Sequence, residues 1–237
     1  MARRVSWKSV ERIVDSLKKG GVIIHPSEYE EYCISCLVDS VNGVGKIREM
    51  KKYKPITGLC VVFPSLDKVR EYTSINNAQI EKIENKFKER KEVLTRRVEE
   101  HEKENAAGRY WYRPGMRKKW IENNVYWFNA PRKEGLISDY VTGGNIEITK
   151  QVRCRLAVYP KILDIIKEVG PLVTEKASMG AVRAAQRYKD LDLEILSYGD
   201  YVVEGTNMGR FEEKEISTKY LGVEKEEVKE SQEKVVK

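Results

Sequence analysis

The sequence predicts an α/β protein in the α+β sense, with a single twisted mixed sheet flanked by helices on both faces. Short apolar runs at 22–24, 59–63 and 172–174 alternate along the chain with short amphipathic segments, which is the pattern of layered α/β domains. The run at 59–63 is continuously apolar, as expected of an inner strand buried on both faces. Hydrophobic residues make up 41% of the chain, which is adequate for a core.

The individual elements follow from local patterns. Residues 6–19 predict an amphipathic helix, because their apolar positions recur at helical spacing and two glycines end the segment. A short buried strand follows at 22–24, before a turn-rich stretch that runs to about residue 35. Further helices are expected at 43–52, 65–72, 160–169 and 181–188. Further strands are expected at 59–63, 125–128, 146–156, 172–174, 193–196 and 201–203, with a loop at 139–145.

Residues 77–106 are highly charged and lack proline and glycine, which predicts one long helix. A helix this polar is either solvent-bridging or held by many charged pairs four residues apart. Two placements are open: a projecting arm or helical hairpin, and a solvated helix lying on the body. Dimerisation through this helix is a third interpretation, disfavoured because sustained heptads are lacking. The narrow apolar stripe consists of Ile80, Ile83, Phe87, Leu94 and Val98.

Charge and composition bound the classes of partner. The chain carries 44 Lys+Arg against 37 Asp+Glu, a formal net charge of +7, which permits an anionic partner such as nucleic acid or nucleotide. No apolar stretch approaches the length of a membrane helix, and no apolar signal-peptide core follows the basic N-terminus. We therefore expect a cytoplasmic protein with no membrane partner. Abundant Lys and Glu with scarce Gln is a bias typical of hyperthermophiles.

The spacing of two cysteines raises the possibility of a metal or redox site. Cys33 and Cys36 have the spacing of such a pair, but the chain has only two histidines and no second close cysteine pair. We therefore expect small apolar side chains in strands, reduced thiols and no bound metal. Neither a P-loop nor a dinucleotide-binding glycine motif is present in the sequence.

Residues 109–120 combine cations with aromatic rings: five Lys or Arg, four aromatics and no acid. Cationic side chains bind the phosphates of nucleic acids, and aromatic side chains stack on unpaired bases. This segment is therefore a candidate RNA-binding surface. The alternative is that the tryptophans are core residues and the cations only solvate a loop. The candidate nucleic-acid-binding residues are Arg109, Trp111, Arg113, Arg117, Lys118, Lys119 and Trp120.

The order of segments from 6 to 206 resembles that of the YrdC-like family, whose best-known members are threonylcarbamoyl-AMP synthases. The strand that ends in His-Pro-Ser, with Ser27 last, is similar to the family's strand followed by Pro-Thr. Tyr32 falls on the Tyr of the family's Tyr-Gly-Leu. The helix end at 47–55 is similar to the segment that carries Lys-x-Arg-Pro, with Lys51 on the lysine.

The later segments resemble the family in the same order. The strand at 59–63 and the helix after it match without a gap, and residues 113–115 are similar to Trp-Pro-Gly. The strand at 151–156 resembles one ending in Val-Arg-Val-Pro, with Arg155 on the family arginine. Residues 170–180 are similar to Gly-Pro-Leu followed by Thr-Ser-Ala-Asn.

The resemblance implies a YrdC-like domain over 1–210, with 77–107 as a long charged helical insertion and 211–237 as a charged C-terminal tail. It implies a pocket for ATP, with Mg²⁺, and for threonine, and no structurally bound cofactor. It also implies RNA as a partner, either tRNA or double-stranded RNA. The ligand-binding residues that it implies are Ser27, Tyr32, Lys51, Lys54, Arg155 and Thr174.

Several positions depart from the family pattern. Tyr53 stands in place of the arginine of Lys-x-Arg, with Lys54 one residue further on, and Glu175 and Ala177 replace a serine and an asparagine. Adenylation needs fixed donors where negative charge develops, and removing one such donor costs on the order of a hundredfold in rate. We therefore favour an RNA-binding YrdC-like protein with a residual nucleotide pocket, and assign no catalytic residue. The alternative is a divergent L-threonylcarbamoyladenylate synthase that uses ATP, threonine and bicarbonate in tRNA modification.

Overall fold

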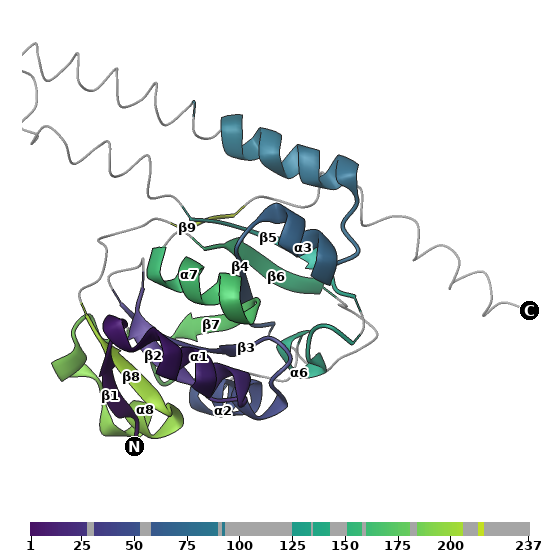
Figure 1. Cartoon of the computed structure of the whole chain (residues 1–237). Coiled ribbons are helices and arrows are strands. Elements are labelled where there is room, and N and C mark those ends of the chain that lie inside the picture. Colours follow the sequence, from purple (N-terminus) through teal and green to yellow (C-terminus); the bar gives the residue numbers. More distant parts are fainter. Residues whose placement is uncertain are drawn as a thin grey trace, which may run out of the picture.

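The computed structural model describes residues 1–27, 31–52, 58–89, 92, 125–133, 135–142, 151–157, 160–180, 184–205 and 213–215. Within these residues one mixed sheet of nine strands runs in the order β1-β8-β2-β3-β7-β4-β6-β5-β9 (Figure 1). The strands are β1 (Arg3–Ser6), β2 (Ile23–Pro26), β3 (Tyr32–Leu37), β4 (Cys60–Phe63), β5 (Val125–Pro131), β6 (Gln151–Leu156), β7 (Leu172–Lys176), β8 (Tyr201–Glu204) and β9 (Glu213–Glu215). The single mixed sheet expected from the sequence is confirmed.

The sheet contains both parallel and antiparallel strand pairs. β8 runs parallel to both β1 and β2, whereas β3 is antiparallel to both β2 and β7. β4 lies antiparallel to β7 and parallel to β6, and β5 is antiparallel to β6. β9, which falls in the stretch expected to be a charged tail, pairs in parallel with β5. The sheet therefore brings together segments from both ends of the chain.

One face of the sheet is covered by α1 (Val10–Lys18) and α7 (Pro160–Val169), which also contact each other (Figure 1). Their buried side chains include Ile13, Leu17 and Ile165. These pack with alternate strand residues such as Ile23 and Leu172 in one hydrophobic cluster. The helix expected within residues 6–19 is thus present, but it starts later than expected. Residues 3–6 form β1 instead, and Trp7–Ser9 form a 3₁₀ turn.

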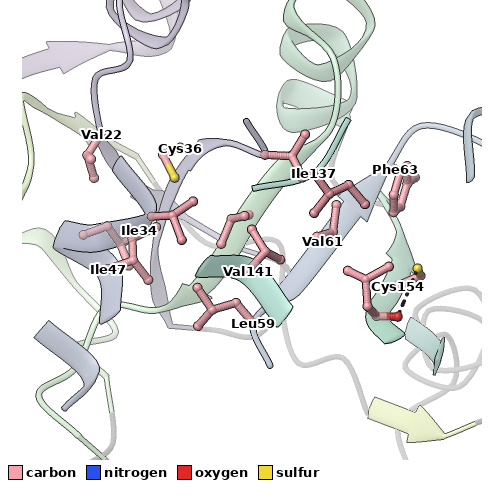
Figure 2. Packing of buried hydrophobic residues seen from close by; sticks show 14 of the residues in the cluster. Val22, Ile34, Cys36, Ile47, Leu59, Val61, Phe63, Ile137, Val141 and Cys154 are labelled. Atoms are coloured by element: carbon pink, nitrogen blue, oxygen red, sulfur yellow. Dashed lines mark hydrogen bonds between the residues drawn. The ribbon is translucent and has the colours of Figure 1, made fainter. Parts of the chain in front are cut away.

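The other face carries the larger cluster, built from the remaining alternate strand residues and from α2 (Val41–Lys51), α3 (Leu66–Tyr72), α6 (Asp139–Thr142) and α8 (Leu193–Tyr198). Ser40 caps α2 by accepting a hydrogen bond from the Gly43 N–H, and Ser65 caps α3 by accepting one from Lys68. Figure 2 shows how residues from distant strands meet in this core. The labelled members are Val22, Ile34, Cys36, Ile47, Leu59, Val61, Phe63, Ile137, Val141 and Cys154.

The charged segment begins as a helix that lies on the body. Residues 77–89 are helical; Ile80 and Ile83 are buried, and Phe87 packs against the larger cluster. The first part of the apolar stripe therefore faces the core, as expected of an amphipathic helix. The second part of the stripe, Leu94 and Val98, lies outside the described residues.

Four local expectations were wrong. Residues 139–145 were expected to form a loop, but Asp139–Thr142 form the short helix α6. The stretch up to residue 35 was expected to be turn-rich, yet residues 32–35 belong to β3, whose residues are buried between β2 and β7. Residues 193–196 were expected to be a strand, but Asp192 accepts a hydrogen bond from the Glu194 N–H and starts α8 instead. Residues 184–187 of the expected helix at 181–188 are not helical, and a short 3₁₀ helix follows at Tyr188–Asp190.

None of the helices in the described parts of the chain is long and apolar enough to cross a membrane.

Candidate functional site

The face covered by α1 and α7 becomes polar toward one end. His25 on β2, Ser35 on β3, Thr174 on β7 and Arg155 on β6 are all buried, with side chains on this same face by strand register. Buried polar side chains are costly unless they are hydrogen-bonded, so their partners decide what this cluster can do. We call His25, Ser35, Thr174 and Arg155 the polar cluster.

Three members of the polar cluster form one hydrogen-bonded chain. His25 Nδ1 lies 2.9 Å from the Pro26 carbonyl oxygen, and His25 Nε2 lies 2.8 Å from Ser35 Oγ. Ser35 Oγ in turn lies 2.8 Å from Thr174 Oγ1. Because the carbonyl can only accept, Nδ1 carries the proton of a neutral imidazole and Nε2 accepts from Ser35. Ser35 has then given its only proton to His25, so Thr174 must donate to Ser35.

The neutral form of His25 follows from its surroundings. Burial and the positive charge of Arg155 together lower the pKa of His25 to about 4, although the hydrogen bond to the Pro26 carbonyl acts in the opposite direction. The imidazole is therefore uncharged at neutral pH. The direction of the hydrogen-bonded chain, from Thr174 through Ser35 to His25, is fixed by this charge state.

Lys51, at the last turn of α2, lies close to the end of β7. Its ammonium nitrogen lies 3.3 Å from the Lys176 carbonyl oxygen, 3.1 Å from the Ser178 carbonyl oxygen and 2.9 Å from Ser178 Oγ. Burial lowers the pKa of Lys51, and the charge of Glu175 opposes this shift. The three protons of the ammonium group thus face three protein oxygens, and the side chain fixes the segment after β7.

The connection between β2 and β3 holds the next two groups. Ser27 Oγ donates to the Glu31 carbonyl oxygen at 2.6 Å, and the Ser27 N–H donates to the same oxygen at 3.2 Å. The Glu31 carboxylate pairs with the Lys176 ammonium at 3.1 Å. The Cys60 N–H donates to the Glu175 carboxylate at 3.0 Å. Two carboxylates therefore lie in a region where the family resemblance implies binding of anions.

The residues expected to bind a ligand are thus placed unevenly. Ser27, Thr174, Arg155 and Lys51 are all buried. Thr174 and Arg155 lie on the face covered by α1 and α7, whereas Lys51 belongs to α2 on the other face. The Tyr32 side chain is fully buried in the larger hydrophobic cluster, and its backbone N–H donates to the Ala185 carbonyl oxygen. Lys54 and all candidate RNA-binding residues between 109 and 120 lie outside the described residues.

Sequence reasoning missed several groups of this site. His25 and Ser35 link the expected Thr174 to the sheet interior, and Ser178 and Glu31 hold Lys51 and Lys176. No local pattern marks Ser35, because both faces of β3 are buried and its residues do not alternate between polar and apolar. The polar residues of this stretch also favour turns, so the strand was not expected.

A metal site is not supported in the described parts of the chain, where no three His, Cys, Asp or Glu side chains gather as ligands. All four cysteines are free and buried. Burial raises the pKa of Cys33 to about 12, and it also raises the pKa of Cys36 and Cys154, so these thiols stay protonated.

Comparison with known proteins finds similarity in structure but not in sequence. Neither a family model nor a curated protein matches the chain. YciO from E. coli superposes with a TM-score of 0.63 at 12% identity, covering 92% of this chain and 93% of that one. A variant of Sua5 from P. abyssi gives a TM-score of 0.60 at 14% identity, covering 87% of this chain and 51% of Sua5. P. abyssi Sua5 in complex with L-threonine gives 0.57 at 14% identity, covering 87% of this chain and 49% of that one. This chain therefore spans about half the length of Sua5.

Proposed function

We propose, because the chain has a YrdC-like fold, that it is an RNA-binding protein on this scaffold and not an efficient threonylcarbamoyl-adenylate synthase. The RNA is a tRNA or a double-stranded RNA. The residual nucleotide pocket that the family resemblance implies then retains at most a weak affinity for a nucleotide. One observation supports the loss of catalysis: protons that an anionic substrate would need are already donated within the protein.

That observation concerns Ser27, Lys51 and Thr174, three residues that the family resemblance implies as ligand contacts. Ser27 donates to the Glu31 carbonyl, and Lys51 faces three oxygens of the segment after β7. Thr174 donates to Ser35, which leaves only oxygen lone pairs for a ligand. Lone pairs repel phosphate and carboxylate oxygens, whereas catalysis of adenylation requires donors directed at the developing charge.

The RNA-binding part of the proposal is supported by charge. The chain has a net charge of +7, and residues 109–120 contain five cations and four aromatics without an acid. Such a segment combines phosphate contacts with stacking surfaces, which is the pattern of proteins that bind single strands and loops.

A divergent synthase is the second candidate, favoured by Arg155 and by the similarity to Sua5 solved with L-threonine. Arg155 is buried and fully charged at any physiological pH, so it would suit a phosphate or carboxylate. In that case Lys51, Lys54 and Arg155 would hold ATP phosphates, Ser27 would hold threonine, and Mg²⁺ would accompany ATP.

Two measurements on the full chain separate the candidates. Pyrophosphate release from ATP, threonine and bicarbonate should be weak or absent, and turnover in the range of about 1–10³ s⁻¹ would overturn the proposal. Binding to tRNA and to duplex RNA should weaken linearly with salt on a log–log plot. Absence of binding at low salt, or binding that ignores salt, would remove the RNA function.

A single substitution tests the aromatic part of the basic segment. Trp111→Ala should weaken binding of single strands by about 1–3 kcal/mol if the ring stacks on a base. It should lower the melting temperature instead if the ring is core, because a cavity then replaces the buried side chain.

A further inference from the structure

A second surface, separate from the polar cluster, forms a hollow of about 1130 Å³ between α1, α2 and the turn from α8 into β8. Residues at helical spacing on α1, including Arg12, Ser16 and Lys19, form one wall. Residues at similar spacing on α2, including Asn42, Lys46 and Glu49, form the opposite wall. We call this hollow the trough.

Gly20, Gly21 and Gly199 are among the residues that line the trough. Gly20 adopts a φ of +78°, a conformation that L-residues with side chains rarely take. A Cβ on Gly21 would lie 2.7 Å from the Ser16 carbonyl oxygen, so only glycine fits there. A Cβ on Gly199 would lie 2.8 Å from the end of the Ile24 side chain, which would have to shift.

The charged side chains that line the trough are four cations and three carboxylates, an excess of one positive charge. Arg3, Arg12, Lys19 and Lys46 line it together with Asp15, Glu49 and Asp200. Asp200 accepts a hydrogen bond from the Val22 N–H at 2.7 Å and lies 3.9 Å from the Lys46 ammonium, so these two charges offset each other. Within the described parts of the chain, neither Arg12 nor Lys19 forms an ion pair with a carboxylate, and both are exposed. Their charge is therefore available to an anionic ligand.

Aromatic rings lie among these cations. The Arg3 guanidinium lies over the Tyr201 ring, 5.7 Å from its centroid. Tyr140 also lines the trough and is 55% exposed, although Arg48 donates to its backbone oxygen and so holds it in place. An exposed ring on a fixed backbone is a ready stacking surface, because every base offers a flat face to it.

We infer that the trough binds an unpaired stretch of RNA, with phosphates on Arg12 and Lys19 and a base on the Tyr140 ring. This inference rests on the proposed RNA-binding function and adds a contact surface that the sequence did not suggest. Cations that follow the backbone and rings that stack on bases are the two requirements for binding a single strand. A duplex satisfies only the first requirement, because its bases are already stacked.

The test uses the full chain and two RNA probes, a 12-nucleotide oligouridylate and a blunt duplex of 12 base pairs. The double variant Arg12→Gln/Lys19→Gln should flatten the salt slope for oligouridylate by about 1.4, because each phosphate that is no longer neutralised accounts for about 0.7. The matched control, Lys161→Gln/Lys167→Gln, removes two exposed cations of α7 outside the trough and should leave the slope unchanged. Tyr140→Ala should weaken oligouridylate binding about 5- to 150-fold and change duplex binding far less.

The outcomes distinguish the two levels of the proposal. The unmodified protein could bind oligouridylate while the Arg12/Lys19 variant and Tyr140→Ala keep the salt slope and affinity of the control variant. The trough is then not the binding site, and only this inference is lost. If the unmodified protein binds neither probe at low salt, the proposed RNA-binding function is itself wrong. Unfolding midpoints equal to that of the unmodified protein confirm that the variants are folded. The Tyr140 variant provides an independent arm should the double variant be unstable.

Discussion

Lowering the pH from 7 to 5 should destabilise the protein through a single residue, His25. Burial lowers its pKa from 6.5 to about 4 in the folded state, so the unfolded chain binds a proton that the folded protein does not. Stability is therefore fully present above about pH 6.5 and is lost as the pH falls toward about 4. The sign is that of a depressed pKa: stability rises with pH throughout this window.

The magnitude follows from the size of the shift. A pKa difference of about 2.5 units corresponds to about 3 kcal/mol, of which about 2 kcal/mol is lost by pH 5. His25 is fully buried, so solvent does not screen this contribution. The attribution is unusually direct because the chain contains only one other histidine, His101.

Urea denaturation at a series of pH values measures this effect, with His25→Gln as the comparison. The unmodified protein should lose about 2 kcal/mol of unfolding free energy between pH 7 and pH 5, whereas the variant should lose much less, whatever its absolute stability. His101→Gln should retain the full dependence if His25 is the source. A pH profile that His25→Gln leaves unchanged would refute both the buried neutral imidazole and the hydrogen-bond direction derived from it.

The remaining predictions concern the polar cluster and the basic segment. Ser35→Ala removes the hydroxyl between two buried partners and should lower the free energy of unfolding by about 2–4 kcal/mol. Thr174→Val removes one donor and should lower it by about 1 kcal/mol. Equal urea midpoints for the two variants would contradict the hydrogen bonds from Thr174 through Ser35 to His25. Lys51→Met should destabilise the protein by about 1–3 kcal/mol without changing the salt dependence of RNA binding, and an altered slope would show that Lys51 contacts RNA. Neutralising Lys118 and Lys119 together should flatten that slope by roughly one to two units with little change in sequence preference, as measured by salt titration.

Much of the fold could be predicted from periodicity because the responsible residues are buried in regular patterns. The amphipathic α1 and α7 follow from apolar side chains at helical spacing, and β4 follows from a continuous apolar run. β3 could not be recognised in this way, since its sequence Tyr-Cys-Ile-Ser-Cys-Leu mixes polar and apolar side chains although every residue before Leu37 is buried. Tertiary pairing with β2 and β7 determines that strand, and local propensity does not.

The sequence placed some residues of the candidate site on one face of the sheet but did not predict their hydrogen bonding, and Tyr32 is buried in the larger hydrophobic cluster instead. Strand order and register bring Thr174 and Arg155 to one face, which the family resemblance implied. Which atom donates to which depends on His25 and Ser35, and on a charge state that burial sets. A sequence comparison reports which residue types are present. Which group of a hydrogen-bonded pair donates depends on distances between strands that are far apart in the chain.

The hydrogen bonding of the polar cluster, together with that of Ser27 and Lys51, bears on how such a scaffold can change its role. A site that binds anions must hold donors without internal partners, and each such buried donor costs stability when no ligand is present. Here Ser27, Lys51 and Thr174 all donate within the protein, which removes that cost and with it the means to hold an anion. Cations on the surface carry no comparable cost, because water solvates them until an anion binds. Binding of RNA through exposed cations, at the trough and at residues 109–120, is therefore compatible with a closed and stable polar cluster, whereas synthase activity would require reopening it.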